Sequence, residues 1–132
     1  MSKYVRVLLP VLAVAALVAV PMAQAKPAVA TITVTEGKPS EFGIKLSVKT
    51  AAVGAVTFKV TNGGNVPHDF KVCSVPTTKA PVDTCNGKGT KQINPGASAV
   101  LAVKFLKAGK YEYLCTVPGH ATAGMKGIIT VK

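Results

Sequence analysis

The chain reads Gly109-Lys-Tyr-Glu-Tyr-Leu-Cys115-Thr-Val-Pro-Gly-His120-Ala-Thr-Ala-Gly-Met125, a strand pattern that runs into a loop with three metal-binding side chains. Tyr111, Tyr113 and Cys115 fall on one side of an extended chain, because side chains alternate with a period of two in a β-strand. The loop then brings a thiol, an imidazole and a thioether within eleven residues. A sheet that ends in such a loop can hold these side chains around one soft metal ion.

The same alternation recurs in most of the chain after residue 29 and predicts short, half-buried β-strands. Apolar residues occupy every second position in these runs: Ala30, Ile32 and Val34; Phe42, Ile44, Leu46 and Val48; Val56, Phe58 and Val60; Phe70 and Val72; Leu101, Val103 and Phe105; Ile129 and Val131. Turn signals separate the runs, as in Asn62-Gly-Gly64 and Asn94-Pro-Gly96. This pattern predicts an all-β fold, a two-sheet antiparallel Greek-key β-sandwich.

The first 25 residues have the three parts of a secretory signal peptide. A short positive region precedes an apolar run at residues 7–20, and Ala23-Gln-Ala25 gives a small-residue cleavage site. The apolar run is shorter than the roughly 20 residues that span a bilayer, which argues against the alternative of an uncleaved anchor. We therefore expect cleavage of residues 1–25 and a single domain at residues 26–132. The mature protein would be exported to the periplasm or another extracytoplasmic space, without stable membrane insertion.

Basic residues dominate the charge of the chain, which is +11, with 16 Lys and Arg against 5 Asp and Glu. After cleavage every remaining cation would be lysine, because the only arginine is Arg6, and the charge would be +9. Specific phosphate and base recognition favours the planar fork of arginine, and aromatic residues for base stacking are few, so we expect no nucleic-acid partner. The lysines form either a solvated surface or a field that steers the protein toward an acidic protein or an anionic membrane.

Three cysteines follow the signal region, and export would place them in an oxidising compartment. Cys73 and Cys85 are 12 positions apart, across a segment with two prolines and no strand pattern, and we expect a disulfide there. The alternative is that both are metal ligands, although their spacing matches no common zinc signature. Cys115 is then an unpaired thiol, which metal ligation would explain.

A further candidate ligand, His68, lies upstream in Asn-Val-Pro-His-Asp-Phe. Two imidazoles and a thiolate in a plane, with a weak axial thioether, form the site expected for copper that cycles between Cu(I) and Cu(II). Taken singly, a histidine on a strand or a methionine after a glycine is more often structural. Together, the candidates use both histidines, the unpaired cysteine and the only methionine after residue 25: His68, Cys115, His120 and Met125. We therefore predict one type 1 copper ion as the cofactor.

The ligand segments resemble those of the cupredoxins, the small blue copper proteins. The resemblance rests on residues 109–127, with their Cys-x4-His-x4-Met loop, and on Asn62-Gly-Gly-Asn-Val-Pro-His68-Asp-Phe. The loop is longer than the Cys-x2-His form of plastocyanins and resembles the loops of auracyanins, rusticyanins and azurins. The resemblance implies a cupredoxin-like sandwich over essentially the whole of residues 26–132.

The resemblance also implies a role for each ligand. Cys115 would be the thiolate that gives the blue colour, and Met125 would be the axial thioether. His68 and His120 would be the equatorial imidazoles, with His120 reaching the surface through an apolar patch as the electron port. Candidates for that patch are Val66, Pro67, Val117, Pro118 and Ala121.

One position departs from the family pattern. Many cupredoxins carry asparagine directly after the first histidine, where its side chain ties the two ligand loops together, whereas this chain has Asp69. We expect the Asp69 carboxylate to accept hydrogen bonds from Thr116 and so to do similar work beside the ligands. Its negative charge would also favour Cu(II) and lower the reduction potential.

These residues favour a soluble one-electron carrier that passes electrons between redox proteins, and we expect a monomer. The alternative is an extracytoplasmic copper-binding protein for copper buffering, delivery or resistance. Such proteins usually carry Met-rich or His-rich tracts, which this chain lacks. A metal-free adhesion domain with a buried Cys115 thiol is a further alternative.

An enzyme is not expected, because catalytic copper proteins need ligands that this chain does not have. Multicopper oxidases and nitrite reductases use further histidines, and both histidines here are committed to one site. A binuclear copper site would need a second cysteine near Cys115, and the sequence has none there. The expected partners are a redox donor and a redox acceptor, at least one of them acidic, with a reaction rate that falls as salt rises.

Overall fold

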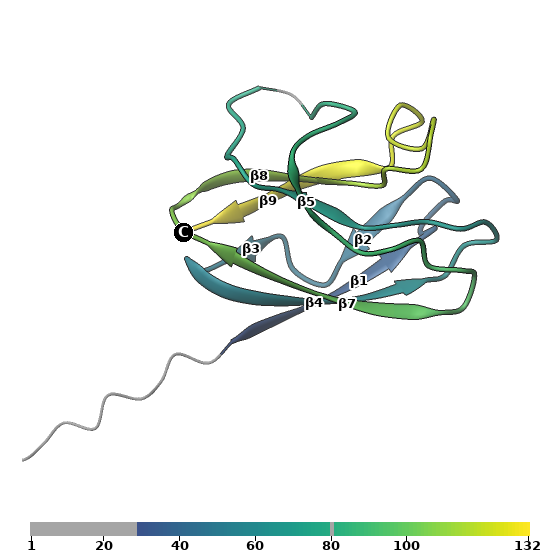
Figure 1. The fold of residues 1–132 in the computed structure, drawn as a ribbon, viewed down its shortest axis with the longest axis horizontal. Helices are drawn as coiled ribbons and strands as arrows, with labels where there is room; N and C mark the ends of the chain where they lie inside the picture. The colour runs from purple at the N-terminus through teal and green to yellow at the C-terminus, as the bar shows by residue number, and fades with distance from the viewer. Residues whose placement is uncertain (1–28, 80) are drawn as a thin grey trace, which may run out of the picture.

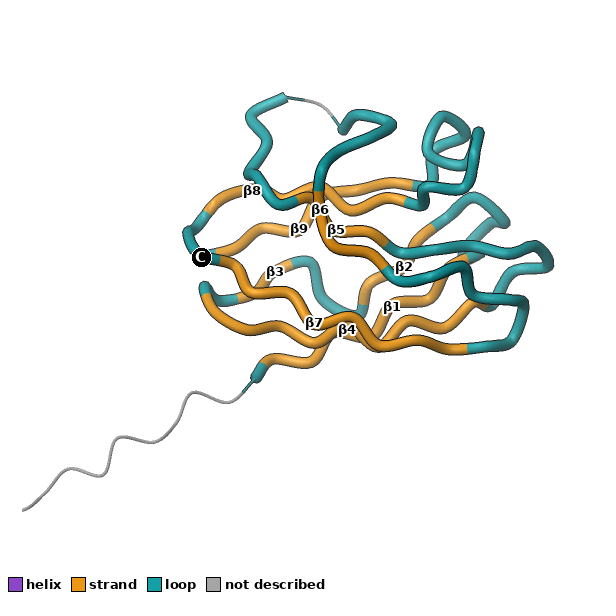
Figure 2. The backbone as a smooth tube through the Cα atoms, in the orientation of Figure 1, coloured by secondary structure: helices purple, strands orange, loops and turns teal. Residues whose placement is uncertain are grey.

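The computed structural model describes residues 29–79 and 81–132, which fold into two facing β-sheets (Figure 1). The strands in these residues are β1 (Ala30–Glu36), β2 (Ile44–Leu46), β3 (Thr50–Ala51), β4 (Gly54–Asn62), β5 (Lys71–Cys73), β6 (Gly87–Gly89), β7 (Ser98–Phe105), β8 (Gly109–Leu114) and β9 (Lys126–Val131). One sheet has the order β2-β1-β4-β7 and the other β3-β9-β8-β5-β6. Strands and loops make up the described chain, as Figure 2 shows, so the predicted all-β sandwich of two sheets is confirmed.

The N-terminal predictions fall on a part of the chain that is not described. The signal peptide expected at residues 1–25 lies outside the described residues. Residues 29–79 and 81–132 include no helix that could span a membrane. Cleavage and export therefore stay predictions.

The prediction that the sheets are strictly antiparallel was wrong, because each sheet contains one parallel pair. β1 pairs with β4 in parallel, with Ile32 opposite Phe58, and β3 pairs with β9 in parallel. Side chains alternate with a period of two in both kinds of sheet, so the sequence pattern carries no strand direction. The chain between β1 and β4, residues 37–53, is long enough for the crossover that a parallel pair requires. The Greek-key order of the connections stays a prediction.

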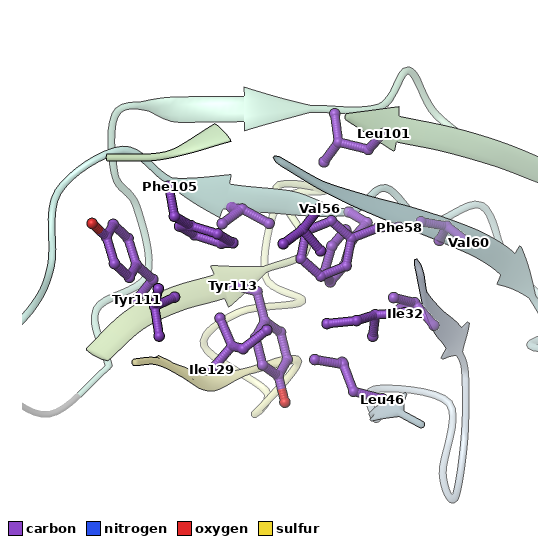
Figure 3. Packing of buried hydrophobic residues seen from close by; sticks show 14 of the residues in the cluster. Ile32, Leu46, Val56, Phe58, Val60, Leu101, Phe105, Tyr111, Tyr113 and Ile129 are labelled. Atoms are coloured by element: carbon purple, nitrogen blue, oxygen red, sulfur yellow. The ribbon is translucent and has the colours of Figure 1, made fainter. Parts of the chain in front are cut away.

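The core lies between the two sheets and is built from the alternating apolar residues of the strands (Figure 3). Phe58 on β4 is fully buried, and its ring centroid lies 5.3 Å from that of Phe70. The Phe70 ring in turn lies 5.7 Å from the ring of Tyr113 on β8. Burial of an apolar side chain of this size contributes about 1.5–3 kcal/mol. Phe70 follows His68 by two residues and Tyr113 precedes Cys115 by two, so this packing fixes the segments that carry two predicted ligands.

The predicted disulfide between Cys73 and Cys85 is present, with 5.7 Å between the two Cα atoms. It closes the long loop between β5 and β6 and packs with Leu114 and Ala121 in a small apolar cluster. In the chain-entropy account, a cross-link over a loop of this length stabilises the fold by about 3 kcal/mol. Because Ala121 follows His120, the cluster also supports one side of the loop that carries the second histidine.

Candidate metal centre

Three of the four predicted ligands converge in one small volume. The Nδ1 atoms of His68 and His120 are 3.1 Å apart. The Cys115 Sγ atom lies 3.5 Å from Nδ1 of His120 and 4.0 Å from Nδ1 of His68. All three ligand atoms lie within 4.8 Å of one another, and the side chains of His68 and Cys115 are fully buried. The arrangement presents two imidazole nitrogens and one sulfur to a common point.

Strand pairing explains why residues 47 positions apart meet. β5 and β8 are antiparallel neighbours, with Lys71 opposite Leu114. His68 lies just before β5 and Cys115 just after β8, so both lie at the same end of this strand pair. Two backbone hydrogen bonds, of 3.2 and 2.7 Å, join His68 to Ile93 and fix the chain just before β5 begins. Figure 1 shows the loop between β4 and β5 and the loop between β8 and β9 at the same end of the molecule.

The loop from Cys115 to Met125 folds back on itself and brings its two ends together. The N–H of Cys115 donates to the carbonyl of Met125 at 3.0 Å, and the N–H of Met125 donates to the carbonyl of His120 at 3.0 Å. Gly119 and Gly124 have φ angles of 83° and 107°, in the left-handed region that favours glycine. The side chain of Met125, the fourth predicted ligand, is fully buried in this loop.

Asp69 links the two ligand segments as expected. Its carboxylate accepts hydrogen bonds from the backbone N–H and the hydroxyl of Thr116, which directly follows Cys115. Its own backbone N–H points at the Cys115 sulfur, 3.4 Å away. The predicted contact between Asp69 and Thr116 is therefore confirmed, and it holds the Cys115 segment against the His68 segment.

Two further residues of the site, Glu41 and Phe42, were not identified from the sequence. Glu41 Oε1 lies 2.9 Å from Nε2 of His68. Hydrogen bonds, first of all from the backbone N–H of Asn65, lower the pKa of Glu41 to about 2, so its carboxylate is charged at neutral pH. The Phe42 ring meets the His120 ring edge-on, with 5.1 Å between centroids. Both residues come from the connection between β1 and β2, far along the chain from any ligand.

The surface beside His120 differs in two respects from the predicted apolar patch. Ala121 was a wrong candidate, because it is only 5% exposed and packs into the disulfide cluster. Phe42, which was not predicted, is 41% exposed and lies against the His120 ring. The other predicted patch residues reach solvent at least in part: Val66, Pro67, Val117 and Pro118.

Burial controls the protonation of Cys115 and His120, the two titratable ligands on the loop. It raises the pKa of the Cys115 thiol to about 12, so the thiol keeps its proton at neutral pH when no metal is bound. Burial, and then the neighbouring His68, lowers the pKa of His120, which favours its neutral imidazole. Metal ligation requires a thiolate and neutral imidazoles. Binding at this site would therefore release the thiol proton.

The donor set fits a copper ion. Two imidazoles and one thiolate close together, with a thioether in the same loop, are the ligands of blue copper sites. A structural zinc site would use four strong nitrogen or sulfur donors. A methionine in place of the fourth strong donor therefore distinguishes this site from a zinc site.

Glu36 is a buried acid at the edge of this region. It lies at the end of β1, fully buried on the core-facing side of the strand, and neither carboxyl oxygen has a hydrogen-bond partner in the described part of the chain. Burial, and then the charge of Asp69, raises the pKa of Glu36 to about 8. The folded protein therefore holds this side chain as a neutral acid at pH 7, near the Asp69 carboxylate and the Cys115 thiol.

We expect the copper-free protein to lose stability relative to its Glu36→Gln variant as pH rises from about 4.5 to about 8. Above pH 4.5, the ordinary pKa of a free glutamate, the unfolded chain releases the proton while the folded chain keeps it. The unfolding free energy then falls by up to about 1.4 kcal/mol per pH unit, and the fall ends near the folded pKa. Urea unfolding of both proteins between pH 4 and pH 9 measures the difference. A difference that does not change with pH would contradict this account of Glu36.

Comparison with known protein families gives a match over residues 29–132. The matching model describes copper-binding proteins of the plastocyanin/azurin family. It covers nearly all of the chain that the structure describes, including all four predicted ligands. The predicted cupredoxin resemblance is thereby confirmed.

Individual relatives match over shorter stretches. The copper-resistant cuproprotein CopI of Rubrivivax gelatinosus is 32% identical over 85 residues, which cover 58% of this chain and 52% of that protein. Auracyanin-B of Chloroflexus aurantiacus is 44% identical over 52 residues, which cover 39% of this chain and 22% of that protein. The matched part of the chain thus spans about half the length of the first relative and less of the second.

Solved structures extend the similarity to most of the chain. A structure of auracyanin B superposes with a TM-score of 0.60 at 25% identity, over 83% of this chain and 93% of that one. A structure of reduced rusticyanin superposes with a TM-score of 0.59 at 21% identity, over 82% of each chain. The rusticyanin likeness shows the fold alone.

Proposed function

Because the chain belongs to the plastocyanin/azurin family of copper-binding proteins, we propose that it is an exported one-electron carrier built around one type 1 copper ion. The proposed ligands are His68, Cys115, His120 and Met125. Copper in such a donor set supplies one-electron chemistry by cycling between Cu(I) and Cu(II). The convergence of the His68, Cys115 and His120 ligand atoms within 4.8 Å is the observation that carries the proposal.

The chain contributes a scaffold that keeps the donors in place in both oxidation states. Hydrogen bonds join His68 to Ile93, and they join the Cys115 segment to Asp69 and Met125. None of these bonds uses the side-chain nitrogen or sulfur atoms that would bind the metal. These contacts resist movement of the ligands when the charge at the site changes. A site that moves little on gaining or losing an electron favours fast transfer.

His120 is the proposed exit for the electron. Its imidazole is half-buried and meets the exposed Phe42 ring, beside the partly exposed apolar residues of its own loop. A small apolar surface around a partly exposed ligand suits brief docking, because weak redox complexes bury little area. Electron transfer through His120 would make and break no covalent bond within the chain.

The proposed partners include at least one acidic redox protein. Of the 16 basic residues, 14 are lysines after residue 25, against 5 acids in the whole chain. A field of this sign accelerates the approach of an acidic partner and weakens as salt screens it. The predicted signal region and the disulfide both support placing this encounter outside the cytoplasm.

A second candidate function is copper handling, and the similarity to the CopI protein of Rubrivivax gelatinosus favours it. That relative is named as a copper-resistant cuproprotein, and in a copper-handling role this chain would bind copper in order to store it or pass it on. Catalysis is not proposed, because the chain has 2 histidines and both belong to the proposed site. The two candidates differ in whether copper stays bound while its charge changes.

Repeated redox cycling in the presence of a Cu(I) chelator separates the two functions. The copper-loaded protein is reduced with ascorbate and reoxidised with hexacyanoferrate(III), with bathocuproine disulfonate present throughout. For an electron carrier we expect the bound copper to remain at one ion per chain over many cycles. Transfer of copper to the chelator within the first cycles would contradict the carrier and favour copper handling.

A further inference from the structure

We propose that Glu41 is a positioning residue of the copper site, which orients the His68 imidazole and fixes the turn before it in advance of copper binding. The inference rests on the proposed function only in taking His68 as a ligand. Glu41 is not itself a ligand in this account, since its carboxylate lies on the far side of the imidazole from the other donors.

The contact with His68 selects one tautomer of the ring. Glu41 Oε1 lies 2.9 Å from Nε2 of His68, whereas Nδ1 of the same ring faces His120 and Cys115. A carboxylate only accepts hydrogen bonds, so Nε2 carries the proton and donates it. A neutral imidazole then has a bare Nδ1, which is the atom that points to the common point of the ligands. A metal-binding histidine is commonly oriented through its second nitrogen in this way.

The same carboxylate also holds the turn that precedes His68. It accepts hydrogen bonds from the backbone N–H of Asn65 at 2.9 and 3.0 Å and from the N–H of Val66 at 3.2 Å. The side-chain amide of Asn65 donates to it at 3.0 Å. From the other side, the Asn62 amide donates to the Val66 carbonyl at 2.8 Å. Hydrogen bonds to two residues, Glu41 and Asn62, therefore fix the turn.

Two glycines allow the close packing that brings Glu41 to His68. A Cβ atom at Gly64 would lie 2.3 Å from Glu41 Oε1 and 2.9 Å from Nε2 of His68, so any other residue would displace the carboxylate. A Cβ atom at Gly37 would lie 2.4 Å from the Cα of Gly64, and Gly37 has a φ of 72°. The backbone of the β1–β2 connection thus packs directly on the turn before His68, and this packing places Glu41 beside the His68 ring.

The contact also affects the balance between the two copper states. A carboxylate on the second nitrogen of a ligating imidazole makes the ligand more basic, and this favours the more highly charged metal ion. The Asp69 carboxylate accepts hydrogen bonds from Thr116 rather than from a ligand ring, so it does not take the place of Glu41. We therefore expect Glu41 to stabilise Cu(II) more than Cu(I).

The variants Glu41→Gln and Glu41→Asp remove the charge and the contact in turn, and the account requires both. Glutamine keeps the length of the side chain but removes the charge, and aspartate keeps the charge but is one methylene shorter. We expect both to weaken Cu(II) binding by about 10–100-fold, as for other groups that support a ligand. Cu(I) binding should fall less, and each tenfold difference raises the reduction potential by about 59 mV. Lys59→Gln, which removes one charge from an exposed side chain on β4, controls for the change in net charge and should leave the potential unchanged.

An imidazole ¹⁵N spectrum of the copper-free wild-type protein tests the orientation without any variant or metal. We expect His68 to show a protonated Nε2 and a bare Nδ1, and Glu41→Gln to show a mixture of tautomers. A proton on Nδ1 in the wild type, or an unchanged potential in both Glu41 variants, would overturn the inference. Failure of the wild type to form a blue copper site would instead overturn the proposed function, so the two failures are distinguishable.

Discussion

Replacing Cys115 by serine will abolish the intense visible absorption of the copper-loaded protein. In this account the colour arises from charge transfer between the Cys115 thiolate and Cu(II), and a serine hydroxyl offers neither the soft sulfur nor its negative charge. The two imidazoles of His68 and His120 remain, so Cu(II) can still bind, more weakly and with a pale spectrum. We expect the narrow copper hyperfine splitting of the wild type to widen in the same sample. Visible and electron paramagnetic resonance spectra at equal copper loading measure both changes.

Met125→Leu is the matched control for this loss. Leucine has a similar volume and keeps the fully buried position filled, so the fold should be little affected. The thioether is the weak ligand of the set, and the intense band should survive its removal. Retention of the intense band in Cys115→Ser, at any copper loading, would show that Cys115 is not the thiolate ligand.

Replacing Phe58 by alanine will lower the free energy of unfolding by about 3–5 kcal/mol. Phe58 is fully buried at the centre of β4, and its ring packs on Phe70 at 5.3 Å between centroids. Because Phe70 belongs to the segment that follows His68, the cavity would also loosen the support of that ligand. Urea unfolding of the copper-free protein measures the loss of stability without a contribution from metal binding.

The neighbouring Lys59→Ala variant controls for the position of Phe58. Lys59 lies on the same strand with its side chain exposed, so its replacement should change the unfolding free energy by no more than about 0.5 kcal/mol. A loss below about 1 kcal/mol for Phe58→Ala would mean that the core does not depend on this aromatic contact.

The sequence predicted those parts of the fold that depend on local pattern. Period-two alternation identified the core residues of β1 and β4, and Cys73 and Cys85 were paired from their spacing and the compartment. Strand direction was wrong for β1 with β4, because alternation is the same in parallel and antiparallel pairs. Ala121 was assigned to the surface patch by resemblance to the family, whereas it is buried in the cluster with Leu114 and the Cys73–Cys85 disulfide.

The candidate site was predictable where its residues are close together in a motif. His120 and Met125 follow Cys115 in one loop, and the resemblance to a known family pointed to the contact between Asp69 and Thr116. Glu41 was missed because it reaches His68 from 27 positions away, through packing of one turn on another. Gly64 was the one available signal, since a missing side chain beside a ligand segment indicates a close approach by another group.

A reductive titration of the copper-loaded wild-type protein, followed by visible and electron paramagnetic resonance spectra, tests the central claim most directly. We predict one copper ion per chain, an intense blue band and a narrow hyperfine splitting. One electron per chain should remove both signals, and reoxidation should restore them in full with the copper still bound. A pale spectrum with wide splitting, or loss of copper during the cycle, would contradict a type 1 electron carrier.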